Sequence, residues 1–159
     1  MMINDLGQDP QPALDYRSRT GQDISTLNHD IILLKAAEVS LVPCIDQLPP
    51  ALREDLMRGI PFGAECNFGQ LAQAENALAC LSGLRDMREQ ERAFNLHFME
   101  QMIDNAGTAG YKDWTCAWKL IQLIFEAYRN VREVALGILS GGKDQRQGYD
   151  VILTGAVKF

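Results

Sequence analysis

The sequence predicts an all-α fold: an antiparallel bundle of three long helices and one short helix, with a flexible N-terminal arm and an extended C-terminal tail. Apolar residues recur at three- and four-residue steps, the spacing of one helix face, over three long stretches, 23–42, 64–105 and 111–140. Residues 149–159 resemble a β-strand, and a single strand cannot satisfy its own backbone hydrogen-bonding groups. The predicted organisation is therefore an arm over 1–22, a helical domain over 23–142 and a tail over 143–159.

The N-terminal arm is predicted because residues 1–22 contain two glycines and two prolines and show no sustained apolar period. The first long helix, 23–42, begins at a favourable N-cap residue, Asp23, and ends before Pro43. The short helix, 51–58, lies between a proline pair and a glycine, which are ordinary start and stop signals.

The second long stretch, 64–105, is rich in small residues in its first half, which favours close packing against another helix. Its middle, 85–92, contains one apolar residue in eight and is either a solvated part of one helix or a break. We predict a continuous helix, because the segment lacks glycine and proline and consists mainly of good helix formers.

The third stretch, 111–140, has so broad an apolar face that the helix is expected to be mostly buried, with Ile124 in the core. Gly141 follows where a left-handed residue commonly ends a helix. Residues 137–143 also match the phosphate-loop spacing G-x-x-x-x-G-K, but Asp144 replaces the required Ser or Thr and a helix precedes the motif. The pattern is therefore interpreted as a helix end.

Composition narrows the possible functions. The formal net charge of −6 disfavours nucleic acid as a partner, and no apolar run reaches the roughly 18 residues of a membrane span. The N-terminus lacks the basic and apolar regions of a signal peptide, so a cytoplasmic location is predicted. The four cysteines are widely scattered and are expected to be buried thiols: Cys44, Cys66, Cys80 and Cys116.

Candidate metal ligands are few. The two histidines are His29 and His97, and Phe94 occupies the position where a helical metal motif would place a glutamate before His97. His29 is expected to be solvated or to cap a helix. No metal, cofactor or catalytic residue is therefore assigned from the sequence.

The favoured function is a non-enzymatic helical interaction or regulatory protein that acts through protein–protein contacts, because no convergent set of catalytic groups is recognisable. The alternative is a small-molecule-binding protein or enzyme with a pocket on the aromatic face of the central helix. That pocket would be lined by Trp114, Trp118, Phe94 and His97.

A homodimer is also predicted, although another protein could be the partner. Helices over 64–105 and 111–140 would extend about 60 Å and about 45 Å, beyond the roughly 40 Å diameter of a domain of this size. Apolar surface would then remain for a second copy to cover, and the unpaired tail has the same need. The interface candidates are Phe94, Phe98, Met102, Val131, Ala135 and Ile138.

Overall fold

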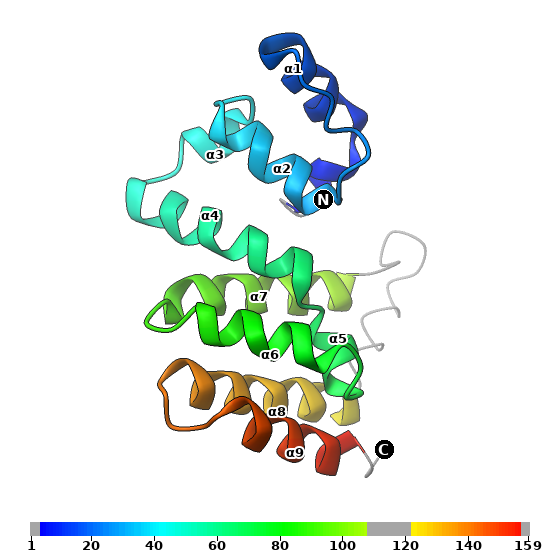
Figure 1. Cartoon of the computed structure of the whole chain (residues 1–159), viewed down its shortest axis with the longest axis vertical. Helices are drawn as coiled ribbons and strands as arrows, with labels where there is room; N and C mark the ends of the chain where they lie inside the picture. The colour runs from blue at the N-terminus through cyan, green and yellow to red at the C-terminus, as the bar shows by residue number, and fades with distance from the viewer. Residues whose placement is uncertain (1–3, 108–121, 157–159) are drawn as a thin grey trace. The chain divides into compact units, whose positions relative to one another are not determined.

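A computed structural model describes residues 4–107 and 122–156 of the chain, and over these residues it contains helices and no strands (Figure 1). The all-α prediction is confirmed. The chain divides into two compact units, Met1–Ala64 and Glu65–Phe159, so the boundary falls inside the single helical domain expected from the sequence. Each unit is described by itself.

From residue 4 onward, unit 1 contains one 3₁₀ helix and four α-helices, the last of which ends one residue past the unit boundary: η1 (Asn4–Gln8), α1 (Pro10–Thr20), α2 (His29–Glu38), α3 (Pro43–Asp46) and α4 (Pro50–Glu65). Both η1 and α1 pack against α2. The prediction of a flexible arm over 1–22 is wrong for the described residues. The Asp9 carboxylate caps α1 by accepting from the Gln11 N–H at 2.8 Å, and Ala13 and Tyr16 are buried in one cluster with Ile24 and Ile32.

Gly7 allows η1 to approach α2 closely. A Cβ atom at this position would lie 2.0 Å from the backbone oxygen of His29, and backbone cannot move aside as a flexible side chain does. We expect Gly7→Ala to destabilise the protein by about 1–2 kcal/mol, a cost limited because η1 can detach from α2. Urea unfolding measures the loss. Gly142→Ala is the matched control, since its Cβ would meet the nearest atom at an ordinary 3.5 Å, and equal losses in the two variants would contradict the expectation.

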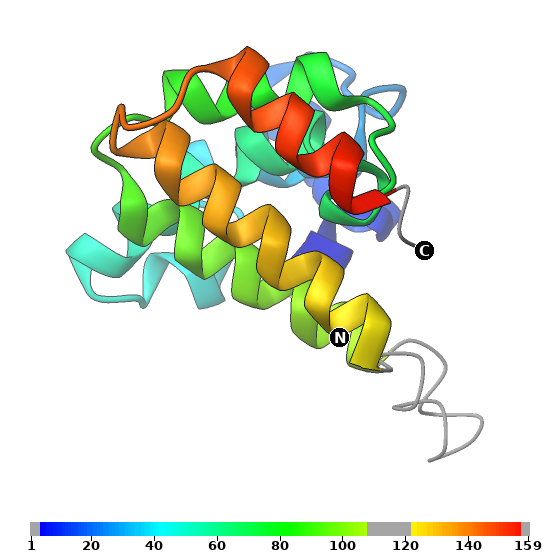
Figure 2. The ribbon, with the colours of Figure 1, turned by 90° about the horizontal axis from the view of Figure 1, so that it is seen from below.

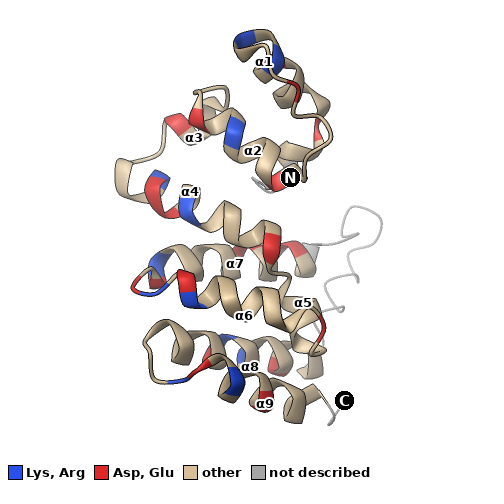
Figure 3. Cartoon of the chain, in the orientation of Figure 1, with Lys and Arg blue, Asp and Glu red and all other residues tan. Residues whose placement is uncertain are grey.

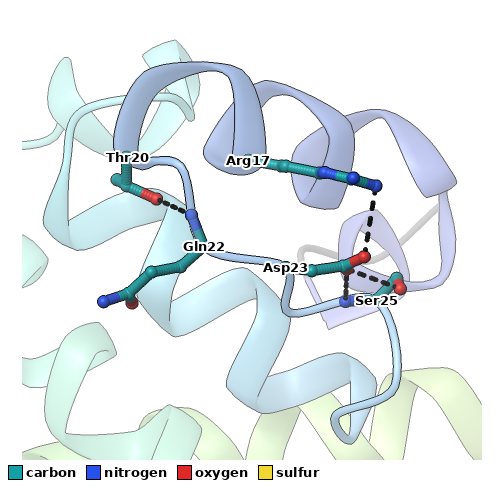
Figure 4. Close-up of polar contacts among 5 residues, drawn as sticks. All are labelled: Arg17, Thr20, Gln22, Asp23 and Ser25. Carbon is teal, nitrogen blue, oxygen red and sulfur yellow. Dashed lines mark hydrogen bonds and ion pairs between the residues drawn. The ribbon is translucent and has the colours of Figure 1, made fainter.

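The first predicted long helix begins later than expected. Asp23 does not start α2, because Asn28 is the N-cap and accepts from the Asp30 N–H at 2.8 Å. Asp23 instead holds the preceding turn (Figure 4): its Oδ1 accepts from the backbone N–H and the hydroxyl of Ser25, and its Oδ2 lies 3.3 Å from the Arg17 guanidinium. The backbone hydrogen bond from Ser25, then its hydroxyl and Arg17, lower the pKa of Asp23 below its ordinary 3.8.

The lowered pKa predicts acid sensitivity of this turn. A carboxylate whose pKa is lower in the folded state contributes stability above the unfolded value of 3.8, and the contribution is lost as the pH falls through the folded-state value. We expect Asp23→Asn to melt below wild type at about pH 6, with a gap that closes toward about pH 2. Ser25→Ala, which removes one of the two Ser25 donors, should show an intermediate gap. Thermal midpoints of the three proteins, measured between about pH 2 and pH 6, test this expectation. A difference in midpoint that does not depend on pH would contradict the stabilising role of the Asp23 carboxylate.

Helix α4 extends beyond the predicted short helix over 51–58. It continues through Gly59 and through Pro61, which has no N–H to donate and usually interrupts a helix. Leu56, Ile60 and Phe62 are all buried. Their burial favours the longer helix over the local stop signals.

The described residues of unit 2, 65–107 and 122–156, form five helices: α5 (Phe68–Ala72), α6 (Ala77–Asp86), α7 (Glu91–Gly107), α8 (Gln122–Leu139) and α9 (Gln145–Ala156). Helices α5 and α6 pack on the pair formed by α8 and α9, and α7 packs on α8 (Figure 2). The predicted bundle of three long helices and one short helix is therefore not what the described residues form.

The predicted continuous helix over 64–105 is wrong, because α4 ends at Glu65 and the helices that follow it are separated by two further breaks, at 73–76 and at 87–90. Asn67 caps α5 by accepting from the Gln70 N–H at 3.0 Å, and Asn76 starts α6 in a left-handed conformation. The second break falls inside 85–92, where Glu89 is left-handed. Met87, the single apolar residue of that segment, is buried. The turn between α6 and α7 allows Met87 to be buried within unit 2. Local helix propensity does not reveal this turn.

The prediction of an extended tail over 143–159 is also wrong, because α9 occupies most of it. Asp144 and Gln147 form a capping box: the Asp144 carboxylate accepts from the Gln147 N–H at 2.7 Å, and the Gln147 side chain accepts from the Asp144 N–H at 3.0 Å. Ile152 is buried, and Gly148 lies directly against α8. Capping and packing therefore outweigh the β-preference of the segment.

The end of α8 agrees with the sequence. Gly141 is left-handed with φ of 75°, and its N–H donates to the Ile138 carbonyl. The interpretation of 137–143 as a helix end is therefore confirmed.

Ile124, near the start of α8, is 40% exposed, so its predicted place in the core is wrong. Residues 111–121 of the predicted helix lie outside the described residues.

Two of the four cysteines are not thiols. Cys66, just before α5, and Cys80, on α6, form a disulfide with their Cα atoms 4.4 Å apart, and both residues are fully buried. Cys44 is free and exposed, and Cys116 lies outside the described residues. Disulfides persist mainly in oxidising compartments, so this bond weighs against the cytoplasmic location, which stays a prediction.

Candidate functional site

The predicted ligand pocket is only partly described. Trp114 and Trp118 lie outside the described residues. Phe94 and His97 both lie on α7 and come together around Phe68 of α5, whose ring centre is 5.7 Å from that of Phe94 and 5.6 Å from that of His97. All three are buried. The two described members of the predicted pocket thus belong to a packed aromatic cluster, completed by Phe98 and Tyr128.

Gln101, which sequence reasoning missed, connects this cluster to the chain before α5. Its Oε1 accepts from the Phe68 N–H at 3.0 Å, and its Nε2 donates to the Cys66 carbonyl at 3.2 Å. The amide orientation is fixed by these two backbone partners. The same Nε2 lies 3.0 Å from His97 Nε2, which accepts there because an amide nitrogen can only donate, and His97 Nδ1 lies 3.9 Å from Glu100 Oε2.

Polar contacts also fix α7 against α8. Asn105 Nδ2 donates to the Tyr128 hydroxyl at 2.8 Å, and Arg132 donates to the Asn95 side chain at 2.8 Å. Burial raises the pKa of Tyr128, while the hydrogen bond from Asn105 opposes the increase and the nearby charge of Asp104 adds to it. These contacts place the C-terminal half of α7 beside the N-terminal half of α8, in antiparallel directions.

Large apolar side chains are exposed at this end of the helix pair. Their exposed fractions run from 40% to 58%, and we call them the α7–α8 apolar surface: Met99, Ile103, Leu123, Ile124 and Phe125. Met99 and Ile103 are four residues apart and share one side of α7. They are offset by one residue from Phe94 and Phe98, which are buried. That offset is the sequence signal that distinguishes the two faces of α7.

The interface residues predicted from the sequence do not belong to the α7–α8 apolar surface. Five of the six are buried within unit 2, and Met102 is half-buried. Phe98, for example, packs against Phe68 and Tyr128 with ring centres 5.2 Å and 6.2 Å away. Phe94, Phe98, Val131, Ala135 and Ile138 are therefore core residues. The homodimer itself stays a prediction, and it requires a different surface.

A groove of about 480 Å³ runs between α8 and α9. Two of its polar side chains already have hydrogen-bond partners, because Glu126 accepts from Gln122 and Asp150 accepts from Arg146.

Within the described residues, no three His, Cys, Asp or Glu side chains are grouped so that they could hold a metal ion. Basic and acidic residues occur in small scattered groups, and much of the helical ribbon carries neither (Figure 3).

None of the helices in residues 4–107 and 122–156 has both the length and the apolar character needed to cross a membrane. No curated protein and no solved structure matches the chain at a significant level. A family model described as "Family of unknown function (DUF6829)" matches residues 1–159. The match covers the sequence from end to end, and the chain therefore belongs to this family, DUF6829.

Proposed function

We propose that this protein is a non-enzymatic interaction protein that binds a second copy of itself through the α7–α8 apolar surface. The supporting observation is that five large apolar side chains of α7 and α8 are each at least 40% exposed. A contiguous exposed apolar patch commonly marks an interaction surface, and we infer that these side chains form one. Met99 and Ile103 on α7 are the most suitable anchors, since more than half of each is exposed.

A second copy is the occupant that this surface fits best. In a two-fold symmetric contact the same patch lies on both sides, so an apolar patch meets an apolar patch without a specialised partner. Two antiparallel helix pairs joined in this way form a four-helix arrangement, a common packing for helical chains. Neighbouring α8 residues of both signs, Glu126 and Arg129, can pair between copies at the rim.

Light scattering on purified protein tests the proposal. We expect a mass twice the 17.7 kDa of the chain at micromolar concentration, and the monomer mass for the double variant Met99→Glu/Ile103→Glu. Both positions are exposed, so the substitutions leave the core intact. Leu78→Glu is the matched control because Leu78 is 86% exposed on α6, and this variant should remain dimeric.

Two results would reject the proposal. One is a wild-type mass that stays at the monomer value on concentrating, because a second copy would then not bind the α7–α8 apolar surface. The other is a Met99→Glu/Ile103→Glu protein that remains dimeric, because the copies would then meet through another surface.

A further inference from the structure

The Cys66–Cys80 disulfide closes a small lobe, residues 66–80, which contains α5 and the first turn of α6. Next to the disulfide, Asn76 Nδ2 donates to the Glu65 carbonyl at 3.2 Å. Inside the lobe, the turn after α5 is held by backbone hydrogen bonds from Ala74 to Leu71 and from Glu75 to Gln70. The lobe is thus closed at its neck by one covalent bond and one hydrogen bond.

The order of this lobe depends on its attachments. Helix α5 has five residues, far fewer than the roughly 12 to 15 that an isolated helix needs for marginal stability. Besides the disulfide, the attachments are the packing of α5 on α8 and α9, the two Gln101 hydrogen bonds, the Asn76 bond and the buried side chains of Phe68 and Leu71. Helices α8 and α9, in contrast, have 18 and 12 residues and pack directly on each other.

We propose that the Cys66–Cys80 pair is a redox-sensitive latch: the lobe is closed when the disulfide is formed and opens locally when it is reduced, while α8 and α9 stay folded. Closing a loop of about 15 residues removes many conformations from the open state. Reduction returns those conformations, and they favour opening of the element with the shortest helix. This inference does not depend on the proposed self-association.

The chemistry is a two-electron exchange with a dithiol. One thiolate of the dithiol attacks a sulfur of the pair, which forms a mixed disulfide and releases the other cysteine as a thiolate. The second thiolate of the reagent then attacks the reagent's own sulfur in the mixed disulfide, which closes the cyclic disulfide and releases the second cysteine. The products are two cysteine thiols and a cyclic disulfide, and the two protons of the dithiol pass to Cys66 and Cys80. Both residues are fully buried, so attack requires a transient opening and the reduction should be slow in the native protein.

Hydrogen exchange of the purified full chain, with and without dithiothreitol, tests the latch. The variant Cys44→Ser/Cys116→Ser leaves the pair as the only cysteines. Mass spectrometry of the unreduced peptides first establishes the bond. We expect exchange of the Leu71, Gln73, Ala74 and Glu75 amides to accelerate about a hundredfold on reduction, the size expected for releasing such a loop. Amides of α9 should keep their protection.

The further variant Cys66→Ser/Cys80→Ser should show the fast lobe exchange without reductant, and dithiothreitol should then have no effect on it. Equal lobe protection in the oxidised and reduced proteins would overturn the proposal, because the other attachments would then suffice. Loss of protection throughout unit 2 would overturn it equally, since the bond would support the whole unit. A pair that stays as free thiols after oxidation with a disulfide reagent would remove its basis.

Discussion

Replacing Phe68 by alanine is expected to lower the free energy of unfolding by about 4 kcal/mol. Phe68 is fully buried and its ring contacts those of Phe94, His97 and Phe98, so the substitution leaves a cavity lined by three side chains of α7. The surrounding helix cannot collapse into this space freely, because Gln101 fixes the backbone on both sides of residue 67.

Urea unfolding followed by circular dichroism measures this loss. Leu78→Ala is the control, because Leu78 is 86% exposed on α6 and its truncation creates little cavity. We expect the control to lose less than about 1 kcal/mol. Similar losses in the two variants would mean that Phe68 is not a core residue.

Replacing Gly148 by leucine is expected to cost about 3 kcal/mol. A Cβ atom at Gly148 would lie 2.8 Å from Ile138 Cδ1 and 3.1 Å from Val134 Cγ1, so any larger side chain forces α9 away from α8. Ile152, the fully buried residue one turn further along α9, would lose packing as the helix moves.

A double-mutant cycle makes this expectation specific. Ile138→Ala removes the atoms that a side chain at residue 148 would meet, so the Gly148→Leu/Ile138→Ala double variant should lose less stability than the sum of the single variants. Unfolding free energies of the four proteins provide the test. Strict additivity would show that residue 148 does not contact Ile138.

The sequence predicts helices well and their connections poorly. The row from Tyr128 through Val131 and Ala135 to Ile138 is buried as its spacing indicates, and Gly141 ends α8 in the expected conformation. The prediction for the tail fails because its β-branched residues suggest a strand, whereas the decisive signal is the capping pair of Asp144 and Gln147. Local propensity is the weaker indicator where a cap and a packing partner are both present.

The candidate sites show the same limit. Phe94 and His97 are three residues apart on one helix, so their proximity follows from the sequence. Phe68, which lies between them in space, belongs to another helix 26 residues earlier, and no periodic pattern relates residues across two chain breaks. Similarly, the exposure of Met99 and Ile103 depends on which neighbours cover α7, which is a tertiary property.

The contacts of Gln101 also explain how the backbone on either side of Asn67, between α4 and α5, is satisfied outside a helix. Its side-chain amide presents one acceptor and one donor to the N–H of Phe68 and the carbonyl of Cys66, as a peptide group of a neighbouring strand would do. The Gln101 side chain thus satisfies the two backbone groups that a neighbouring strand would satisfy in a sheet. Asparagine, shorter by one methylene group, could not bridge both groups from the same position on α7, and glutamate would offer no donor to the carbonyl.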